Sequence, residues 1–254
     1  MLGKQPNLAE TWSNTIVSFE SPHKLRDLSM PERELAPGQN QSVEQQKFKI
    51  RLASSSERVQ SASMLIQKMY SWRGYEAGPL EDTPNRITLL SFSDDHVVGT
   101  CSLGLDSPQG LSTDEIYKDK VDELRAAGSK VCELIKLAVD QSIKSKRVLA
   151  SLFHIAYIYA RPIHGFTDVV IEVNPRHVLF YEKMLGFRRF GEERMCPRVD
   201  APAVLMRLEI AYMDEQIEKF GGKMEEASKE KSLYPYFFSR SEEKGITNRL
   251  LHGA

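Results

Sequence analysis

The segment from Ser129 to Asn174 constrains the fold of this chain more than any other part of the sequence. It holds a nearly continuous apolar run, Val131–Val139, then a short basic loop, a long apolar segment, Val148–Ala160, and a second apolar run, Val169–Val173. The pattern predicts a strand, a buried helix and a second strand, which is a βαβ crossover and requires two parallel strands. Nearly continuous apolar runs of this kind are typical of strands that are covered on both faces of a sheet.

Two charged residues, Glu133 and Lys136, interrupt the first apolar run. A charge inside a strand is costly unless it is paired or used. Alternation along a strand predicts that the two side chains point to opposite faces, so they can pair only if a bulge intervenes. The face of Glu133 is then shared with Val131, Ile135, Leu137 and Val139, and the face of Lys136 with Cys132, Leu134 and Ala138.

The surroundings of Glu133 leave two interpretations open. A carboxylate that is isolated among aliphatic side chains would have a raised pKa and could take a proton in catalysis. A carboxylate that is paired with a cation, such as Arg73 or Arg207, would instead form a buried ion pair with a structural role.

The loop after the first apolar run is basic. It carries Lys144, Lys146 and Arg147, and no acidic residue occurs between Asp140 and Asp168. These cations stand at the start of the predicted helix, where free N–H groups and the helix dipole favour anions. Because cations at this end oppose the dipole unless an anion is present, the loop predicts an anion-binding site. The alternative is a solvated run of charges.

An aromatic-rich stretch, Tyr70–Tyr75, surrounds a single arginine, Arg73. Aromatic residues near a helix end commonly form an ordinary corner of the core. An arginine among aromatic residues can also clamp a carboxylate through two parallel hydrogen bonds. Both interpretations remain open.

The order of polar and apolar segments predicts three parts of the chain. Residues 1–45 lack sustained periodicity and are expected to be a mobile N-terminal extension. Residues 46–210 form one α/β domain, and residues 211–254 form a helical C-terminal extension and an arm. Inside the domain, Ser112 and Glu115 form a capping box that opens a helix.

Composition excludes several classes of protein. The net charge is −1, so the whole chain has no global attraction to nucleic acid or to anionic membranes. The three cysteines are far apart, which favours a reducing compartment. No apolar run reaches the roughly 18 residues that span a bilayer, so a cytoplasmic location is expected. The histidines show no metal-ligand spacing, and no metal is expected.

Two segments, Val169–Asn174 and Phe180–Phe187, resemble the closing motif of the GNAT acyltransferase superfamily. The resemblance implies an α/β fold with a mixed central sheet, splayed parallel strands and flanking helices. The sequence departs from the motif in two ways. One extra residue separates Tyr181 from Gly186, and the loop that grips the pyrophosphate of coenzyme A in these folds contains no glycine here, at 141–147.

A closer resemblance points to a particular branch of the superfamily. Cys132–Asp140 resembles a strand of the acyl-homoserine lactone synthases, which take acyl groups from acyl carrier protein. Four other segments resemble N-acyl amino acid synthases of the FeeM type, and the likeness covers most of residues 48–210. They are Met69–Tyr75, Lys146–Ala150, Val173–His177 and Arg198–Val204.

The FeeM-type resemblance implies transfer of a long acyl chain from acyl carrier protein to the α-amine of an amino acid. The carrier protein is acidic and would dock on Lys144, Lys146 and Arg147. Its phosphopantetheine has a single phosphate and no adenosine pyrophosphate, so a glycine-rich loop is dispensable. No cofactor would stay bound permanently, and acyl-CoA is the alternative donor.

The resemblance also implies roles for single residues. Glu133 is the candidate general base for the amine, and Tyr181 is a candidate acid for the leaving thiolate. Arg73 would hold the carboxylate of the amino acid, and N–H groups from Leu137 to Val139 would polarise the thioester carbonyl. The remaining contacts of the amino acid are expected to be Trp72, Tyr75 and Lys136. Those of the phosphopantetheine arm and the carrier are expected to be Leu137, Val139, Asn174 and the three loop cations.

Three other functions stay open on the sequence. One is an acetyl-CoA-dependent N-acetyltransferase, which the glycine-free loop disfavours. Another is an enzyme similar to the lactone synthases. The third is a module that binds acyl groups or carrier protein without catalysis; loss of an ionisable residue at position 133 would have favoured it, but Glu133 is present.

Overall fold

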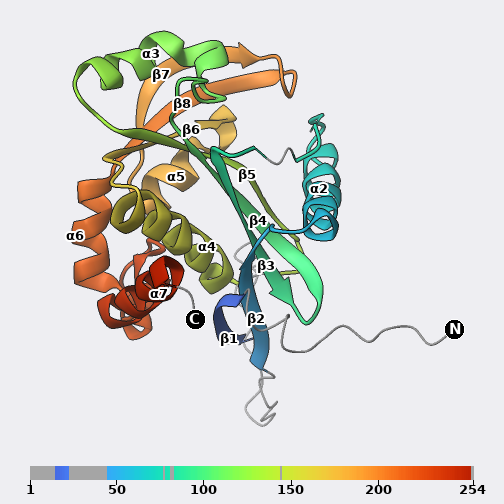
Figure 1. Cartoon of the computed structure of the whole chain (residues 1–254), viewed down its shortest axis with the longest axis vertical. Coiled ribbons are helices and arrows are strands. Elements are labelled where there is room, and N and C mark those ends of the chain that lie inside the picture. The colour runs from blue at the N-terminus through green and yellow to red at the C-terminus, as the bar shows by residue number, and fades with distance from the viewer. Residues whose placement is uncertain (1–14, 23–44, 77, 81–82, 144, 253–254) are drawn as a thin grey trace, which may run out of the picture.

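One mixed sheet of eight strands organises the chain, which the computed structural model describes at residues 15–22, 45–76, 78–80, 83–143 and 145–252. The strand order is β1-β2-β3-β4-β5-β6-β8-β7 (Figure 1). The strands are β1 (Thr15–Pro22), β2 (Gln45–Leu52), β3 (Arg86–Ser93), β4 (His96–Leu105), β5 (Val131–Val139), β6 (Asp168–Val173), β7 (Arg188–Cys196) and β8 (Ala201–Glu209). β5 and β6 run parallel, whereas the other neighbouring strands described are antiparallel.

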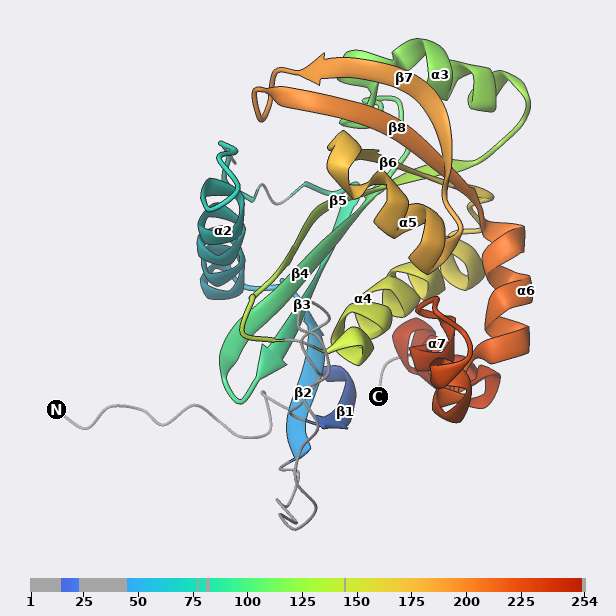
Figure 2. The same cartoon turned by 180° about the vertical axis from the view of Figure 1, so that it is seen from behind.

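Helices cover both faces of the sheet. On one face lie α2 (Ser56–Ser71) and α3 (Asp114–Ala126). On the other side lie α4 (Lys146–Ile158), α5 (Val178–Leu185), α6 (Ile210–Phe220) and α7 (Arg240–His252) (Figures 1 and 2). Short helical turns are η1 (Tyr159–Ile163), η2 (Pro175–His177), η3 (Met224–Ser228) and η4 (Tyr234–Tyr236). Of the helices in the described ranges, none has the length and apolar character needed to cross a bilayer.

The predicted βαβ crossover is confirmed, because β5, α4 and β6 follow one another and the two strands are parallel. The helix is buried from Val148 onward along nearly its whole length, as its mostly apolar sequence requires. Pairing between the strands joins Val131–Glu133 to Asp168–Val170, whereas β5 continues to Val139 and β6 to Val173. The expected splay of the two strands beyond this point stays a prediction.

The N-terminal part of the chain differs from the expectation of a mobile extension over residues 1–45. Thr15–Pro22 form β1, which pairs antiparallel with β2. Ile16 and Phe19 are buried in the main core, and this burial outweighs the polar composition of the surrounding sequence. The other residues of the extension, 1–14 and 23–44, lie outside the described residues, and the expected domain boundaries at 45 and 210 stay predictions.

The C-terminal segment packs onto α4 around His154, whose side chain is fully buried. The imidazole stacks on Phe237 and Phe238, with centroid distances of 4.9 and 5.3 Å. Its Nδ1 accepts the Phe238 N–H (2.9 Å), so Nε2 carries the proton and donates to Glu243 of α7 (3.0 Å). Arg240 donates to both oxygens of the same carboxylate at 2.9 Å. Burial lowers the pKa of His154, although Glu243 opposes the shift, so the ring is a neutral donor.

Replacing Glu243 with alanine is expected to lower the free energy of unfolding by about 2–3 kcal/mol, because His154 and Arg240 would each lose a buried partner. Glu218→Ala is the matched control, since Glu218 also pairs with Arg240 (3.1 Å) but its side chain is 75% exposed. The control should lose less than about 1 kcal/mol. Urea denaturation measures both variants, and equal losses would contradict the assignment.

Candidate active site

A bulge in β5 at Lys136 changes the direction of the side chains that follow it. Ser102 of β4 pairs with Ile135, and Thr100 pairs with Ala138, so two residues of β5 lie opposite one residue of β4. Lys136 adopts a left-handed backbone with φ of 53°. Its carbonyl oxygen accepts a hydrogen bond from Thr100 Oγ1 (2.6 Å), which helps to stabilise this costly conformation.

The bulge reverses the alternation at the end of β5. Leu137 and Val139 pack in the core under α4, whereas Ala138 packs against α2. The prediction that Leu137 and Val139 share a face with Glu133 is therefore wrong, and so is the one that groups Ala138 with Cys132, because the extra residue shifts the alternation by one. The expected role of these N–H groups toward a thioester stays a prediction.

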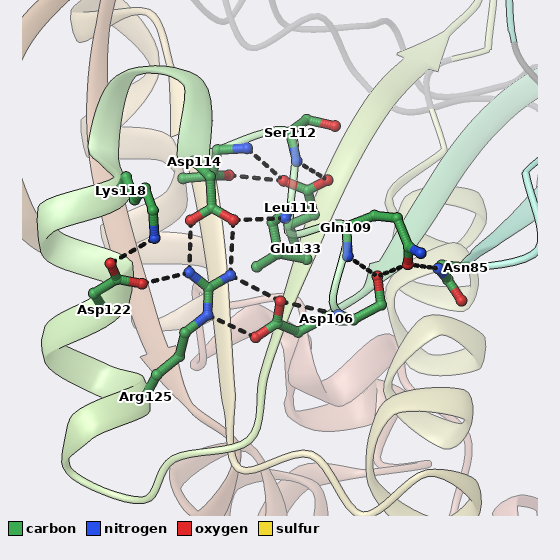
Figure 3. A network of polar contacts seen from close by, with 12 residues as sticks. Asn85, Asp106, Gln109, Leu111, Ser112, Asp114, Lys118, Asp122, Arg125 and Glu133 are labelled. Carbon is green, nitrogen blue, oxygen red and sulfur yellow. Dashed lines mark hydrogen bonds and ion pairs between the residues drawn. The ribbon is translucent and has the colours of Figure 1, made fainter.

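Glu133 is buried, and both of its carboxylate oxygens are hydrogen-bonded at the start of α3 (Figure 3). Oε1 accepts the Ser112 N–H (2.9 Å), and Oε2 accepts the N–H and the hydroxyl of Thr113 (2.9 and 2.8 Å). A helix N-terminus carries partial positive charge, which favours a carboxylate there. Gly104 on β4 leaves the room for it, because a Cβ at that position would lie 2.7 Å from Cγ and Oε1 of Glu133.

Neither sequence-based interpretation of Glu133 matches these contacts. The carboxylate is not isolated among aliphatic side chains, since three donors reach it. Among the described contacts it also makes no ion pair, and Arg207, one expected partner, binds Asp168 instead (2.7 Å). Its expected role as a base stays a prediction.

The loop that supplies these donors is braced by Arg125 of α3 (Figure 3). The guanidinium binds Asp106 (2.8 Å), Asp114 (2.7 Å) and Asp122 (2.7 Å), and these carboxylates raise its pKa. Asp114 also accepts the Leu111 N–H (2.7 Å). Burial raises the pKa of Asp114, but its hydrogen bonds to Arg125 and Leu111 lower it below its usual value overall. The ionised network holds the loop and the first turn of α3 together.

The predicted capping box at Ser112 and Glu115 does not open α3. The N-cap residue is Thr113, and its side chain makes no capping hydrogen bond. Its hydroxyl donates to Glu133, and Glu115 pairs with Arg198. The carboxylate that reaches the N–H groups therefore comes from a neighbouring strand and not from the first turn of the helix.

A second carboxylate, Glu172 of β6, lies on the same face of the sheet as Glu133. Glu133 pairs with Val170, and Glu172 follows two residues later, so strand alternation returns its side chain to that face. Arg198, between β7 and β8, donates to Oε2 of Glu172. Oε1 is buried and has no hydrogen-bond partner within the described part of the chain.

The surroundings of Glu172 favour its neutral form more than those of an ordinary carboxylate. Burial raises the pKa of Glu172 to about 7. Arg198 acts against this shift, whereas the negative charges of Glu133 and Glu115 add to it. Sequence reasoning missed both Glu172 and Arg198 as site residues. The signal was available, because Glu172 is a lone charge in the apolar run Val169–Val173.

The aromatic stretch at the end of α2 lies against the segment that follows β6. Arg176 donates to the Tyr75 hydroxyl (2.6 Å), and its guanidinium lies 5.1 Å from the centre of that ring. Arg73 lies 5.6 Å from the ring of Trp72, which is 68% exposed, and donates to the Met69 carbonyl (3.2 Å). Of the expected amino acid contacts, Tyr75 therefore reaches the segment that follows β6, whereas the described contacts of Trp72 and Arg73 lie within the end of α2.

The pKa of Tyr181 on α5 responds to groups of the same corner. Burial raises its pKa, Tyr70 adds to the shift and Arg73 opposes it. Burial also raises the pKa of Tyr70 to about 12. Burial is the main cause that lowers the pKa of His177, and the positive charges of Arg176 and Arg73 lower it further. The corner therefore combines fixed positive charge with hydroxyls that keep their protons at neutral pH.

The other expected site residues make contacts within the chain. Lys136 Nζ donates to the Gly78 carbonyl (3.2 Å), beyond α2. The Asn174 side chain accepts the Arg176 N–H (3.2 Å) and donates to the Pro202 carbonyl (3.3 Å), so it fixes the turn after β6. Among the residues that the structure describes, no group of histidine, cysteine, aspartate and glutamate is placed to hold a metal ion.

Two cations of the basic loop, Lys146 and Arg147, contact η4 and β1. Lys146 Nζ lies 5.7 Å from the centre of the Tyr236 ring. Arg147 donates to the Glu20 carbonyl (3.0 Å) and lies 5.3 Å from the centre of the Phe19 ring. Lys144 lies outside the described residues. Ser145 caps α4 by accepting the Val148 N–H (3.3 Å), and the first turn of α4 contains no acidic residue.

Comparisons with known proteins agree with this architecture. A family model described as "N-acyl amino acid synthase FeeM" matches residues 61–209, more than half of the chain. The solved structure of FeeM, an N-acyl amino acid synthase from uncultured soil microbes, is 27% identical with a TM-score of 0.61, and the match covers 65% of this chain and 93% of FeeM. Among curated proteins, a sequence search found no match.

Two more distant solved structures are similar to the chain. The AHL synthase LasI is 14% identical with a TM-score of 0.47, over 64% of this chain and 90% of LasI. Escherichia coli ElaA is 14% identical with a TM-score of 0.46, over 64% of this chain and 98% of ElaA.

The predicted GNAT acyltransferase fold is confirmed, and the enzyme is an acyltransferase. The chain belongs to the FeeM family of N-acyl amino acid synthases.

Proposed function

We propose that this acyltransferase moves a long acyl chain from the thioester of an acyl carrier protein to the α-amine of an amino acid. The observation that carries the proposal is the pair of carboxylates, Glu133 and Glu172, on one face where the pairing of β5 with β6 stops. An amine nucleophile must lose a proton to attack a thioester, so a buried carboxylate is the group that this reaction needs. Glu133 is the base expected from the sequence, and Glu172 is a second candidate.

The acceptor is proposed to bind at the corner between α2 and η2. Arg73 has the geometry and charge to hold a carboxylate, and its described hydrogen bond is to a single main-chain carbonyl. The exposed indole of Trp72 and the ring of Tyr75 offer apolar surface beside it for the acceptor. An α-amino acid carries a carboxylate and a primary amine on one carbon, which suits a site with both cations and carboxylates.

Tyr181 is proposed as the acid that protonates the leaving thiolate. Because burial raises its pKa, the phenol is protonated at neutral pH, which is the form that can donate. Its ring is held edge-on against Phe187, with a centroid distance of 5.8 Å. Packing of this kind fixes the direction of the hydroxyl group.

The donor is proposed to be a carrier protein because of the basic loop. Lys146 and Arg147 contact aromatic rings, and such contacts leave both charges in place for an acidic partner. No glycine occurs at 141–147, where coenzyme A-dependent relatives grip a pyrophosphate. Phosphopantetheine on a carrier protein has no pyrophosphate to grip.

The acyl chain needs an apolar path. A small void of about 10 Å³ lies in the core between the sheet and α4. Its lining is almost wholly apolar, and it includes Leu134 of β5, Phe153 of α4 and Phe187 beside Tyr181. A void of this size holds about one water molecule, so a long chain would enter only as the surrounding side chains move apart.

Incubation with acyl-loaded carrier protein and a mixture of amino acids is expected to give N-acyl amino acids, which mass spectrometry detects. Acyl-CoA with the same chain should react more slowly at equal concentration, because it cannot use the protein contacts of the carrier. Equal rates from the two donors would contradict the carrier-protein donor, and acetylated amines alone would favour an acetyl-CoA-dependent enzyme.

Reversing two charges of the basic loop, with Lys146→Glu and Arg147→Glu together, is expected to raise KM for the carrier protein about 10-fold. Added salt should raise KM of the wild-type enzyme in the same direction, because screening weakens exposed charge pairs. Lys229→Glu with Lys231→Glu is the control, since both lysines are exposed near η3. A loss confined to kcat would show that the loop does not dock the carrier.

A further inference from the structure

We infer that Glu172 binds the ammonium group of the acceptor through Oε1 and accepts its proton, while Arg198 holds the carboxylate in position through Oε2. This inference rests on the proposed function, because it names the base of that reaction. The chemical class that the site would take is a primary ammonium group.

The position of Glu172 suits a group that meets a ligand. The side chain is only 11% exposed, yet Oε1 has no hydrogen-bond partner in the described part of the chain. Buried polar atoms are normally satisfied, so an unpartnered carboxylate oxygen indicates a donor that arrives with a ligand. Glu172 also lies two residues beyond Val170, the last residue of β6 that pairs with β5.

Arg198 fixes the orientation of this carboxylate. It stands in the turn between β7 and β8, and it is anchored on the start of α3 by the Ser112 carbonyl (2.9 Å) and by Glu115. From this anchor it donates to Oε2 of Glu172. A charge-assisted hydrogen bond on one oxygen leaves the other oxygen directed elsewhere. Arg198 is therefore a positioning residue.

Glu133 is less available to the amine. Its two oxygens accept three hydrogen bonds from Ser112 and Thr113, so both already have partners within the chain. Glu133 does border a pocket of about 360 Å³ beside β3 and β4, so the experiment has to separate the two carboxylates.

The charges around Glu172 suit a base that works near neutral pH. Burial raises its pKa to about 7, Arg198 opposes this shift, and Glu133 and Glu115 add to it. Two other titratable groups face it and are neutral at that pH: the thiol of Cys196, with Sγ 3.9 Å from Oε2, and the hydroxyl of Tyr117, whose pKa burial and Glu172 raise to about 12. A carboxyl of this kind can gain and lose a proton within each turnover.

The atoms of the step balance without another reactant. Oε1 takes one proton from the ammonium, and the amine nitrogen forms a bond to the thioester carbon. The carbon–sulfur bond breaks, and the thiolate takes the second proton of the nitrogen, directly or through Tyr181. The amide and the free thiol leave, and Glu172 releases its proton to water.

The pH dependence of kcat/KM for the amino acid tests the assignment. The wild-type enzyme should lose activity as the pH falls through about 7, since a protonated base cannot accept a proton. Glu172→Gln should lower kcat about 10²–10⁴-fold and remove this acid limb. Glu133→Gln should keep the limb but move it to lower pH, because a negative neighbour of Glu172 is lost. If Glu133→Gln removes the acid limb and Glu172→Gln keeps it, Glu133 is the base and the inference is overturned.

Arg198→Gln should move the acid limb to higher pH, because a positive neighbour of Glu172 is lost. Arg194→Gln is the matched control: Arg194 lies on β7 and also binds α3, through Asp119 (2.7 Å) and the Ile116 carbonyl (2.6 Å). The control should leave the limb in place. A purely structural role of Arg198 would lower activity without moving the limb, and this result would contradict its assigned role.

A second measurement does not depend on turnover or on a folded Glu172 variant. In wild-type protein with ¹³C-labelled glutamate, the Glu172 carboxyl resonance should titrate near pH 7, and methylammonium should lower that pKa, whereas tetramethylammonium, which has no N–H, should not. A resonance that titrates near the ordinary value of about 4.3, or that ignores methylammonium, overturns the inference. Absence of product with an intact methylammonium response would refute the proposed function alone.

Discussion

The contact between Glu133 and the first turn of α3 is the interaction on which the site depends. It joins a central strand to the N–H groups of Ser112 and Thr113, and without it the buried Thr113 N–H would lack this partner at a cost of about 1–3 kcal/mol. The Ser112 carbonyl then anchors Arg198, and Arg198 holds Glu172. One carboxylate therefore positions the helix, and through the helix it positions the second carboxylate.

Much of the fold could be predicted from sequence because its buried strands and helix appear as mostly apolar runs. The runs at Val131–Val139 and Val169–Val173 are apolar apart from three charged residues, and such runs fit strands that are covered on both faces. The bulge at Lys136 could not be predicted in the same way. It depends on the register with β4 and on the Thr100 hydroxyl, which lies 36 positions away in the sequence.

The candidate site could likewise be predicted only in part. The sequence shows a glutamate inside each of two apolar strands, and such a residue needs a polar partner, but the sequence does not show which residue the partner is. Glu133 meets a helix start about 20 residues earlier, and Glu172 meets Arg198 from a later hairpin. Ser112 and Glu115 show how a local signal can be overridden, because contacts with Glu133 of β5 and with Arg198 in the β7–β8 turn replace the short-range capping pattern.

The pairing of His154 with Glu243 has a consequence for the order in which the protein folds. The two residues are 89 positions apart, and the second lies in α7. Closing a long loop costs more chain entropy than forming a local contact, so this pairing is expected to form after α4 has packed on the sheet. Until α7 docks, the central helix carries an imidazole without its carboxylate partner and an apolar flank that Ile246 does not yet cover.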